Sequence, residues 1–338
     1  MTQATAIAVL GAGSWGTALA IQFARSGTPT FLWGRQEDHL DRLAEDRENQ
    51  HYLPGAKFPS ELRVEPDLQK ALTAAPMVLV AVPSHAFRQT LEMLRPFLRS
   101  DARVSWATKG FEVESGLLPH QIAATVLGPD IATAVLSGPT FAKEVGAGLP
   151  TAMTVASADA DFASALAESI SGDRFRAYTS NDMVGVEVGG AVKNALAIGA
   201  GICDGLGFGA NTRVALITRG LVEMTRLGVA LGAQPATFMG LAGMGDLVLT
   251  CTDDLSRNRR MGLALAAGKT VAEAETGIGQ VVEGVKAAEA VHRVAAKANI
   301  EMPICEQIYR ILYLGEDPRT AVSTLMQRDL KSEFAPGS

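Results

Sequence analysis

Short apolar runs, separated by polar segments, are the main pattern in the first half of the chain. Five runs rich in hydrophobic residues end in glycine, proline or polar residues, at 7–10, 30–33, 77–82, 103–108 and 132–136. A strand that is buried on both faces gives this pattern, so the runs predict a mostly parallel sheet covered by helices. Two further strands are predicted at 151–157 and 175–180.

The pattern changes period after residue 180. From there the chain reads as helices joined by short loops, with long apolar helical stretches at 184–206 and 211–232. The predicted fold is therefore α/β, with an N-terminal Rossmann-type sheet followed by an all-helical C-terminal domain. We expect a dinucleotide-binding domain at 1–180, a helical substrate and catalytic domain at 181–330, and a flexible tail at 331–338.

The first predicted strand runs into a glycine-rich turn, GAGSWG, and then into a helix that ends near Gly27. Gly11 permits the sharp reversal, Gly13 lets the backbone approach a pyrophosphate, and Gly16 lets the helix pack closely on the strand. Backbone N–H groups at the start of the helix would face the phosphates. The four apolar residues before the turn favour a dinucleotide site over an ordinary strand-to-helix turn.

The residue after the second strand bears on the choice of dinucleotide. An NAD site usually places a carboxylate about 20 residues past the glycines, to hold the ribose hydroxyls. Here Gly34 and Arg35 follow the strand. A guanidinium suits a 2′-phosphate, so we expect NADP(H) to be preferred. An exposed loop arginine is the alternative, and Glu37 and Asp38 lie near enough to keep NAD(H) open.

Composition narrows the class of protein. The chain has 338 residues with 47% hydrophobic and 20% charged residues, as expected of a globular protein with two cores. The net charge of −6 argues against a general nucleic-acid or membrane-surface binder. No signal peptide and no apolar run of membrane-spanning length is expected, and three scattered cysteines fit a reducing compartment, so the cytoplasm is the expected location. The five histidines lack metal-ligand spacing and are expected in loops or on the surface, and no metal is expected.

The loops that follow the predicted strands are candidates for a shared crevice. Ligands bind outside the carboxyl ends of the strands in an open parallel sheet. The segments AVPSHAF, ATKGF and SGPTFA should therefore line one crevice with the glycine turn, although strand-to-helix loops favour such residues in any case. Lys109 stands out, because a lysine at the end of a buried strand calls for a negative partner.

A single lysine interrupts the apolar helix of the second half. Between Val188 and Cys203 the only charged residue is Lys193. Burial makes a lysine give up its proton more easily, so Lys193 is a candidate general acid and base. The alternative is a lysine that extends to solvent at a domain boundary. The small residues around it indicate close helix packing.

Two later segments carry further candidates. Asp246 follows a glycine-rich turn and either caps a helix or orients Lys193, and Thr250 would face the same side one turn later. Ser256 is a natural N-cap, and the following residues 257–260 read RNRR. Cations oppose the dipole at a helix start, so either an anion binds there or the basic turn is simply solvated. Glu283 in GQVVEG would begin another helix, consistent with capping or with cofactor contact.

Taken together, these segments resemble the bacterial NAD(P)-dependent glycerol-3-phosphate dehydrogenases. The resemblance spans nearly the whole chain in order, and its segments are GAGSWGTALA, AVPSHAFR, ATKGFE, SGPTFAKE, VGGAVKNALAIGAGICDGLGFGANT, LAGMGDLVLTC, LSRNRR and GQVVEG. It implies reversible reduction of dihydroxyacetone phosphate to sn-glycerol 3-phosphate, which supplies glycerophospholipid synthesis. The implied partner is this small-molecule substrate, with no nucleic acid and no membrane span, and a homodimer stays open.

The resemblance also implies residue roles. Besides the turn glycines, it assigns the cofactor to Ser14, Trp15, Arg35, Lys109, Ala142, Arg257, Val281 and Glu283. It assigns the substrate to Lys109, Gly138, Thr140, Lys193, Asp246, Ser256, Arg257 and Asn258. Lys193 would be the proton donor and acceptor, oriented by Asp246, while Lys109 and the amide of Asn194 would polarise the reacting oxygen. Many members have serine where Thr140 stands and asparagine where Asp254 stands; a carboxylate near a phosphate site should either point away or belong to a differently placed loop.

Two other classes of protein stay open at this point. The β-hydroxyacid and 6-phosphogluconate dehydrogenases also join a nucleotide domain to a helical one that carries a lysine. They place an asparagine one helical turn after that lysine, where this chain has Ala197. A non-catalytic dinucleotide sensor would need neither a lone buried lysine nor a second anion site.

Overall fold

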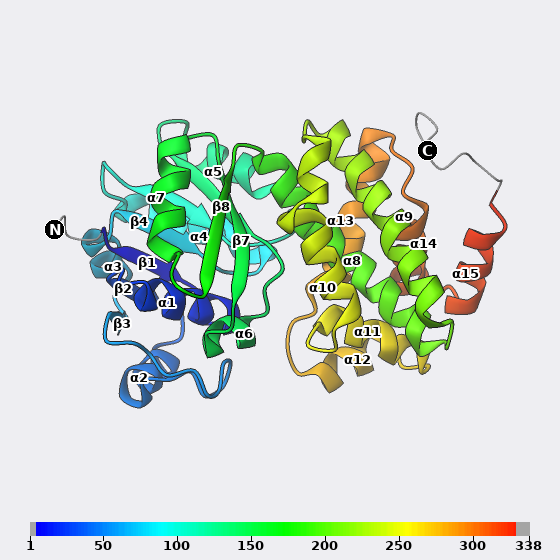
Figure 1. The fold of residues 1–338 in the computed structure, drawn as a ribbon, viewed down its shortest axis with the longest axis horizontal. Coiled ribbons are helices and arrows are strands. Elements are labelled where there is room, and N and C mark those ends of the chain that lie inside the picture. The colour runs from blue at the N-terminus through cyan, green and yellow to red at the C-terminus, as the bar shows by residue number, and fades with distance from the viewer. Residues whose placement is uncertain (1–4, 329–338) are drawn as a thin grey trace. The chain divides into compact units, whose positions relative to one another are not determined.

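The computed structural model describes residues 5–328 and divides into two compact units. Unit 1 runs to Lys109 and resumes from Leu117 to Glu187, while unit 2 consists of Gly110–Gly116 and the chain from Val188 onward. Figure 1 shows a twisted sheet with helices in unit 1 and a bundle of helices in unit 2. The predicted fold class is therefore confirmed. The tail predicted at 331–338 lies outside the described residues.

Eight strands in the described part of unit 1 form one sheet, in the order β3-β2-β1-β4-β5-β6-β7-β8. Neighbours from β3 to β6 are parallel, β7 is antiparallel to β6, and β8 is parallel to β7. The strands are β1 Ile7–Leu10, β2 Thr30–Trp33, β3 Leu62–Val64, β4 Met77–Val80, β5 Arg103–Trp106, β6 Thr133–Ser137, β7 Thr151–Ser157 and β8 Phe175–Ser180. The apolar runs predicted all of them except β3, a three-residue edge strand.

Helices cover both faces of this sheet, which explains the continuous apolar runs. The helices of unit 1 are α1 Ser14–Arg25, α2 Glu37–Asp46, α3 Leu68–Ala74, α4 Ser84–Leu94, α5 Pro119–Leu127, α6 Ala142–Ala147 and α7 Ala160–Ile170. Helices α1, α6 and α7 pack together, as do α3, α4 and α5. The chain moves from β1 to β2 in one direction along the sheet and from β4 to β5 in the other. Because both connections are expected to be right-handed, their helices lie on opposite faces of the sheet. All four residues of β1 are accordingly buried.

Helix α8 is the centre of unit 2. The helices there are α8 Met183–Gly205, α9 Gly209–Ala230, α10 Asp246–Thr252, α11 Arg257–Ala266, α12 Val271–Ile278, α13 Glu283–Ala298, α14 Pro303–Leu314 and α15 Pro318–Met326. A Cβ at Gly201 would lie 2.0 Å from the carbonyl oxygen of Arg259, and one at Gly262 would lie 2.0 Å from that of Ile198. The backbones of α8 and α11 therefore touch, and the predicted close helix packing is confirmed.

Helix α8 is long and apolar enough to cross a membrane by length and composition alone. The expectation that no apolar run reaches membrane-spanning length is therefore wrong. The apolar stretch is entirely buried inside the structure, as in the core helix of a globular protein. Length and hydropathy do not distinguish these two environments.

Helix α8 begins in unit 1, where polar contacts fix its first turns. Asp182 accepts a hydrogen bond from the backbone N–H of Gly185 at 2.9 Å. The buried carboxylate of Glu187 accepts from Nε1 of Trp106 at 2.9 Å and pairs with Nδ1 of His120 at 2.5 Å. Burial lowers the pKa of His120, but the contact with Glu187 outweighs it, so this pKa is raised overall. His120 was expected in a loop or on the surface, and its pairing with a buried carboxylate was not predicted.

A second buried carboxylate lies within unit 2. Glu223 of α9 is 3% exposed and accepts the backbone N–H groups of Ile304 and Cys305, at 2.7 and 3.1 Å, in the first turn of α14. Burial raises the pKa of Glu223 to about 7, although both hydrogen bonds lower it. The folded protein therefore holds this proton more tightly than the unfolded chain does.

This shift predicts a pH-dependent loss of stability. A carboxyl pKa raised from 4.5 to about 7 stabilises the folded state fully below pH 4.5, and that contribution is lost as pH rises to 7. Relative to Glu223→Gln, the wild-type free energy of unfolding should fall by roughly 3 kcal/mol between pH 4.5 and 8. Urea denaturation across this range measures the difference. The exposed control Glu275→Gln should track the wild type, and a pH-independent difference for Glu223→Gln would contradict the assignment.

Candidate functional site

The glycine turn of unit 1 has the geometry that its spacing predicts. Gly11 has φ +125°, and a Cβ at Gly16 would lie 1.9 Å from the carbonyl oxygen of Gly11. Both positions therefore require glycine for the turn and for close packing. A Cβ at Gly13, in contrast, would meet nothing within 4 Å. Gly13 leaves open space directly before α1, and its position at the helix N-cap provides no side-chain cap for the helix.

Polar side chains from the segment after α2 hold this turn in place. Asn49 is fully buried, and its Nδ2 donates to the carbonyl oxygen of Ala12 at 3.0 Å and to Oγ1 of Thr17 at 2.8 Å. The hydroxyl of Ser14 donates to the carbonyl oxygen of Tyr52 at 2.8 Å. No local sequence pattern indicates this role of Asn49, because its partners are backbone and hydroxyl groups distant in sequence.

His39 is a further support for the turn and corrects an expectation. It was expected in a loop or on the surface, but it lies in α2, is 8% exposed, and its Nε2 is 3.3 Å from the carbonyl oxygen of Ala12. Its ring also packs edge-on against Tyr52. A histidine on the buried face of a polar helix is visible only once the helix phase is known.

The other candidates of unit 1 follow carboxyl ends of parallel strands, which meet at one edge of the sheet. Arg35 is exposed two residues after β2, and Lys109 is partly buried three residues after β5. After β6, Gly138 has φ +152° and the hydroxyl of Thr140 donates to the carbonyl oxygen of Gly138 at 3.2 Å.

Two more candidates of unit 1 lie at helix starts. Ala142 is the first residue of α6 and is partly buried. Trp15 lies in the first turn of α1, and its Nε1 is buried without a hydrogen-bond partner among the described residues. A buried N–H of this kind is costly unless a ligand or water accepts from it.

The buried lysine of unit 2 is paired. Lys193 is 7% exposed, and its ammonium donates to the carboxylate of Asp246 and, at 2.9 Å, to Oγ1 of Thr250. The alternative of a lysine extended to solvent is therefore wrong. Asp246 is fully buried, and its carboxylate contacts the ammonium of Lys193, as the orienting alternative predicts. Thr250 faces the same side, as predicted.

A local distortion delivers Asp246 to the lysine. The residues before α10, Leu241–Gly245, form a single π-helical turn. A Cβ at Gly189 would lie 2.4 Å from the carbonyl oxygen of Ala242, so this turn lies directly on α8, one helical turn before Lys193. Asp246 follows in the first turn of α10, where the helix dipole favours a carboxylate. The glycine-rich sequence LAGMG thus serves close packing and a change of helix geometry together.

Amide side chains join α8 to the starts of α11 and α13. Nδ2 of Asn258 donates to Oδ1 of Asn194 at 2.8 Å, and Oδ1 of Asn258 accepts the backbone N–H of Gly284 at 2.9 Å. Nδ2 of Asn194 lies 3.5 Å from Oε2 of Glu283, the first residue of α13. Asn194, adjacent to the lysine, therefore contacts both of these segments. Val281, two residues before α13, is exposed.

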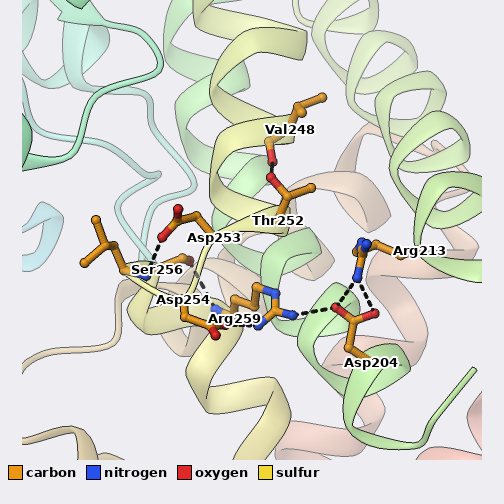
Figure 2. Close-up of polar contacts among 9 residues, drawn as sticks. Asp204, Arg213, Val248, Thr252, Asp253, Asp254, Ser256 and Arg259 are labelled. Atoms are coloured by element: carbon orange, nitrogen blue, oxygen red, sulfur yellow. Dashed lines mark hydrogen bonds and ion pairs between the residues drawn. The ribbon is translucent and has the colours of Figure 1, made fainter. Parts of the chain in front are cut away.

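The first turn of α11 contains both a compensated and an uncompensated cation. Ser256 is the N-cap and accepts the backbone N–H of Arg259 at 3.2 Å, as predicted. Arg259 is buried and pairs with Asp204 at 2.6 Å and also with Asp254, as Figure 2 shows. Arg257 is partly buried and has no hydrogen-bond or ion-pair partner among the described residues. The two predicted alternatives, a bound anion or a solvated basic turn, therefore do not account for the whole turn, because Arg259 is neutralised by carboxylates of the chain itself.

Asp204 and Asp254 complete this cluster from opposite sides (Figure 2). Asp204 on α8 also accepts two hydrogen bonds from Arg213, both at 2.8 Å. The Asp254 side chain is 77% exposed, and its carboxylate faces Arg259. A carboxylate near a basic helix start is thus balanced by a guanidinium. No local sequence pattern indicates a role for Asp204, which lies more than 50 residues before its partner Arg259.

Unit 1 is a Rossmann-type sheet with a glycine-rich turn, and unit 2 is a helical domain with a buried lysine. These two features together define the class of proteins to which the chain belongs. Models of the N-terminus and C-terminus of NAD-dependent glycerol-3-phosphate dehydrogenase match residues 6–163 and 182–323. The chain therefore belongs to the NAD-dependent glycerol-3-phosphate dehydrogenase family. This membership separates it from the hydroxyacid and phosphogluconate dehydrogenases that the sequence left open.

Similar proteins cover nearly the whole chain. Glycerol-3-phosphate dehydrogenase (NAD(P)+) of Aeromonas salmonicida is 58% identical over 98% of this chain and 100% of its own length, and that of Colwellia psychrerythraea is 54% identical over the same shares. The crystal structure of glycerol-3-phosphate dehydrogenase from Coxiella burnetii has a TM-score of 0.92 at 47% identity, covering 96% of this chain and 99% of that one. No group of three or more His, Cys, Asp or Glu residues within 5–328 is placed to hold a metal ion.

The charge cluster at α11 predicts two very different mutational effects. Asp204→Ala would leave the buried Arg259 without its buried partner and would also unpair Arg213, so we expect a loss of about 3 kcal/mol in the free energy of unfolding. Asp254→Ala removes an exposed partner of the same arginine and should cost less than about 1 kcal/mol. Urea denaturation of both variants measures the contrast. Equal losses would show that Asp204 does not carry the compensation.

Proposed function

We propose that this protein catalyses the reversible reduction of dihydroxyacetone phosphate to sn-glycerol 3-phosphate with hydride from NAD(P)H. The names of the full-length relatives support both the reaction and the NAD(P) dependence. The single observation that carries the proposal is the buried Lys193 ammonium, held by Asp246 and Thr250 in unit 2. A binding protein without catalysis would gain nothing from the cost of burying this amine.

The residues of unit 1 fit a dinucleotide. The open space at Gly13 and the uncapped start of α1 suit a pyrophosphate, and the unpartnered Nε1 of Trp15 suits an acceptor on the same ligand. When bound, the nicotinamide supplies or accepts the hydride. We assign its binding to Gly11, Gly13, Ser14, Trp15, Gly16, Arg35, Lys109 and Ala142 of unit 1 and to Arg257, Val281 and Glu283 of unit 2.

The start of α11 fits the phosphate of the substrate. Arg257 offers a guanidinium without an internal partner, and the hydroxyl of Ser256 retains its proton for donation because its oxygen accepts from Arg259. Asn258 retains one N–H beyond the bond to Asn194. We assign the phosphate to these three residues, and the rest of the substrate to Lys109, Gly138, Thr140, Lys193 and Asp246.

Lys193 then moves the proton. As the carbonyl carbon is reduced, its oxygen develops negative charge, and the ammonium of Lys193 donates a proton to it; in the oxidation direction the amine takes the proton back. Asp246 and Thr250 fix the ammonium, so that little reorganisation accompanies the transfer. Lys109 and the amide of Asn194 would polarise the same oxygen. Binding energy from the phosphate end positions the carbonyl.

Two variants should separate chemistry from substrate binding. Lys193→Ala should lower kcat at least about 100-fold and leave NAD(P)H binding within about threefold, because the amine acts on the reacting oxygen. Arg257→Ala should raise the KM for dihydroxyacetone phosphate roughly 10- to 100-fold, because a charged hydrogen bond to the phosphate is lost. Steady-state NADPH oxidation measures both. Arg260→Ala, an exposed arginine of the same turn, is the control for Arg257.

The outcomes that contradict these roles are distinct. An unchanged kcat in Lys193→Ala would make the lysine structural, and an unchanged KM in Arg257→Ala would remove the phosphate site from α11. Thermal unfolding of each variant identifies a loss of folding. No turnover by the wild type with dihydroxyacetone phosphate and either nicotinamide would favour the sensor over the enzyme.

We further propose that NADPH is preferred over NADH. Arg35 is exposed after β2, in the region where an NAD site usually has a carboxylate. Its guanidinium should hold a 2′-phosphate, so NADPH should bind at least about tenfold more tightly than NADH. Arg35→Ala should weaken NADPH binding and leave NADH binding unaltered. Fluorescence titration with both nucleotides tests this, and equal affinities in the wild type would overturn the preference.

We also propose a cytoplasmic location for this reaction, with its product supplying glycerophospholipid synthesis. The three cysteines are free and buried, as expected of a protein folded in a reducing compartment. Burial raises the pKa of Cys251 to about 12, which keeps this thiol protonated and unreactive. Recovery of the activity in an extracytoplasmic fraction would contradict the location.

A further inference from the structure

We infer that unit 2 carries a second binding site, for a single-chain amphiphile with an anionic head group. The site is a solvent-accessible cavity of about 270 Å³ lined by α8, α9, α14 and α15. None of the residues assigned to the dinucleotide or to the phosphate ester lines it. The inference is independent of the proposed reaction and concerns a different region of the helical unit.

The walls of the cavity are largely apolar and suit an alkyl chain. Ile202 of α8, Leu216 of α9, Ile308 of α14 and Leu325 of α15 each contribute to the lining. An apolar cavity of 150 Å³ is large enough for benzene, so this one should accommodate roughly ten carbon atoms. Because the cavity opens to solvent, an alkyl chain that occupied it would remove this apolar lining from water, which is favourable.

Helix α15 closes one side of the cavity without being embedded itself. Of its residues, only Ala321 is buried, and Met326 is 80% exposed although it also lines the cavity. The apolar face of α15 therefore lines the cavity, and an alkyl chain of a ligand could enter from the side of this helix.

The charges of the lining indicate an anionic head group. Arg219, Arg226 and Arg328 line the cavity, against Glu223 as the single acid among the described lining residues. The carboxylate of Glu223 is already occupied by two N–H groups of α14. Arg226 and Arg328 donate to Glu301, whereas Arg219 is partly buried and has no partner among the described residues.

Arg219 is therefore the principal candidate for the head group. A partly buried guanidinium without a partner gains a charge-assisted hydrogen bond when a carboxylate or phosphate monoester approaches it. Oε1 of Gln307 is a second unsatisfied group of the lining, buried and without a partner among residues 5–328. A hydroxyl on the ligand would satisfy it. The two groups together favour an amphiphile over a purely apolar molecule.

Titration calorimetry of the full chain with decanoate tests the proposal. The matched probes are 1-decanol, kept below its solubility limit, and decyltrimethylammonium, kept below its micelle concentration. All three tryptophans lie in unit 1, so calorimetry is preferable to intrinsic fluorescence. Decanoate should bind at one site, and at least about tenfold more tightly than 1-decanol, although the alcohol is the more hydrophobic of the two. Decyltrimethylammonium should not bind. 3-Hydroxydecanoate should bind more tightly than decanoate, and equal affinity would remove Gln307 from the site.

Variants locate the binding. Arg219→Gln should weaken the binding of decanoate about tenfold and leave the affinity for 1-decanol unchanged. The exposed control Arg319→Gln should change neither affinity. Val322→Trp fills the cavity from α15 and should abolish binding, whereas Ser323→Trp, on the neighbouring exposed position, should not. Ala215→Trp, on the exposed rim of α9, blocks the same space if Val322→Trp does not fold. Absence of decanoate binding, equal binding of the cationic probe, or full binding by both tryptophan variants of the lining would overturn the proposal.

Discussion

The helical unit depends on the burial of one charge, the ammonium of Lys193 against the carboxylate of Asp246. A buried ion pair is weak evidence for stability, because desolvation can cost as much as the attraction returns. Its presence here is better explained by chemistry that needs an amine in a dry, fixed position. Gly189 permits the π-helical turn to lie on α8, and this turn brings Asp246 to the lysine. Small residues in α8 are therefore a condition of the site as well as of the packing.

The same constraint explains the polar residues around α11. Once α8 and α11 touch at Gly201 and Gly262, any polar group between them must find its partner inside the unit. Asp204 neutralises Arg259, and Asn258 satisfies both Asn194 and the backbone of Gly284. Arg257 lies at the edge of this network and has no partner in it among the described residues. The turn can offer one free guanidinium to an anion because its other buried guanidinium is satisfied internally.

The sequence predicted the features that depend on local pattern. Apolar runs located seven strands, the glycine spacing located the turn, and the isolation of Lys193 in an apolar helix identified it as a special residue. It could not predict features created by distant partners. Asn49 supports the glycine turn through groups 32 and 37 residues away, and Asp204 pairs with an arginine 55 residues later. The short strand β3 escaped because three residues show no periodicity. The hydropathy of α8 was underestimated because its glycines and alanines do not form a conspicuous apolar run.

The position of α8 in the chain has a consequence for dividing the protein. Its first turns belong to unit 1, where Asp182 caps it and Glu187 is held by Trp106 and His120, while Lys193 lies in unit 2 less than two turns further along. A helical fragment cut at the boundary of the units would begin with a bare helix end close to its own lysine. Fraying of its first two turns would reach Lys193, whose position matters most. Unit 2 is thus compact by itself, but we do not expect it to keep its site intact when it is cut from unit 1.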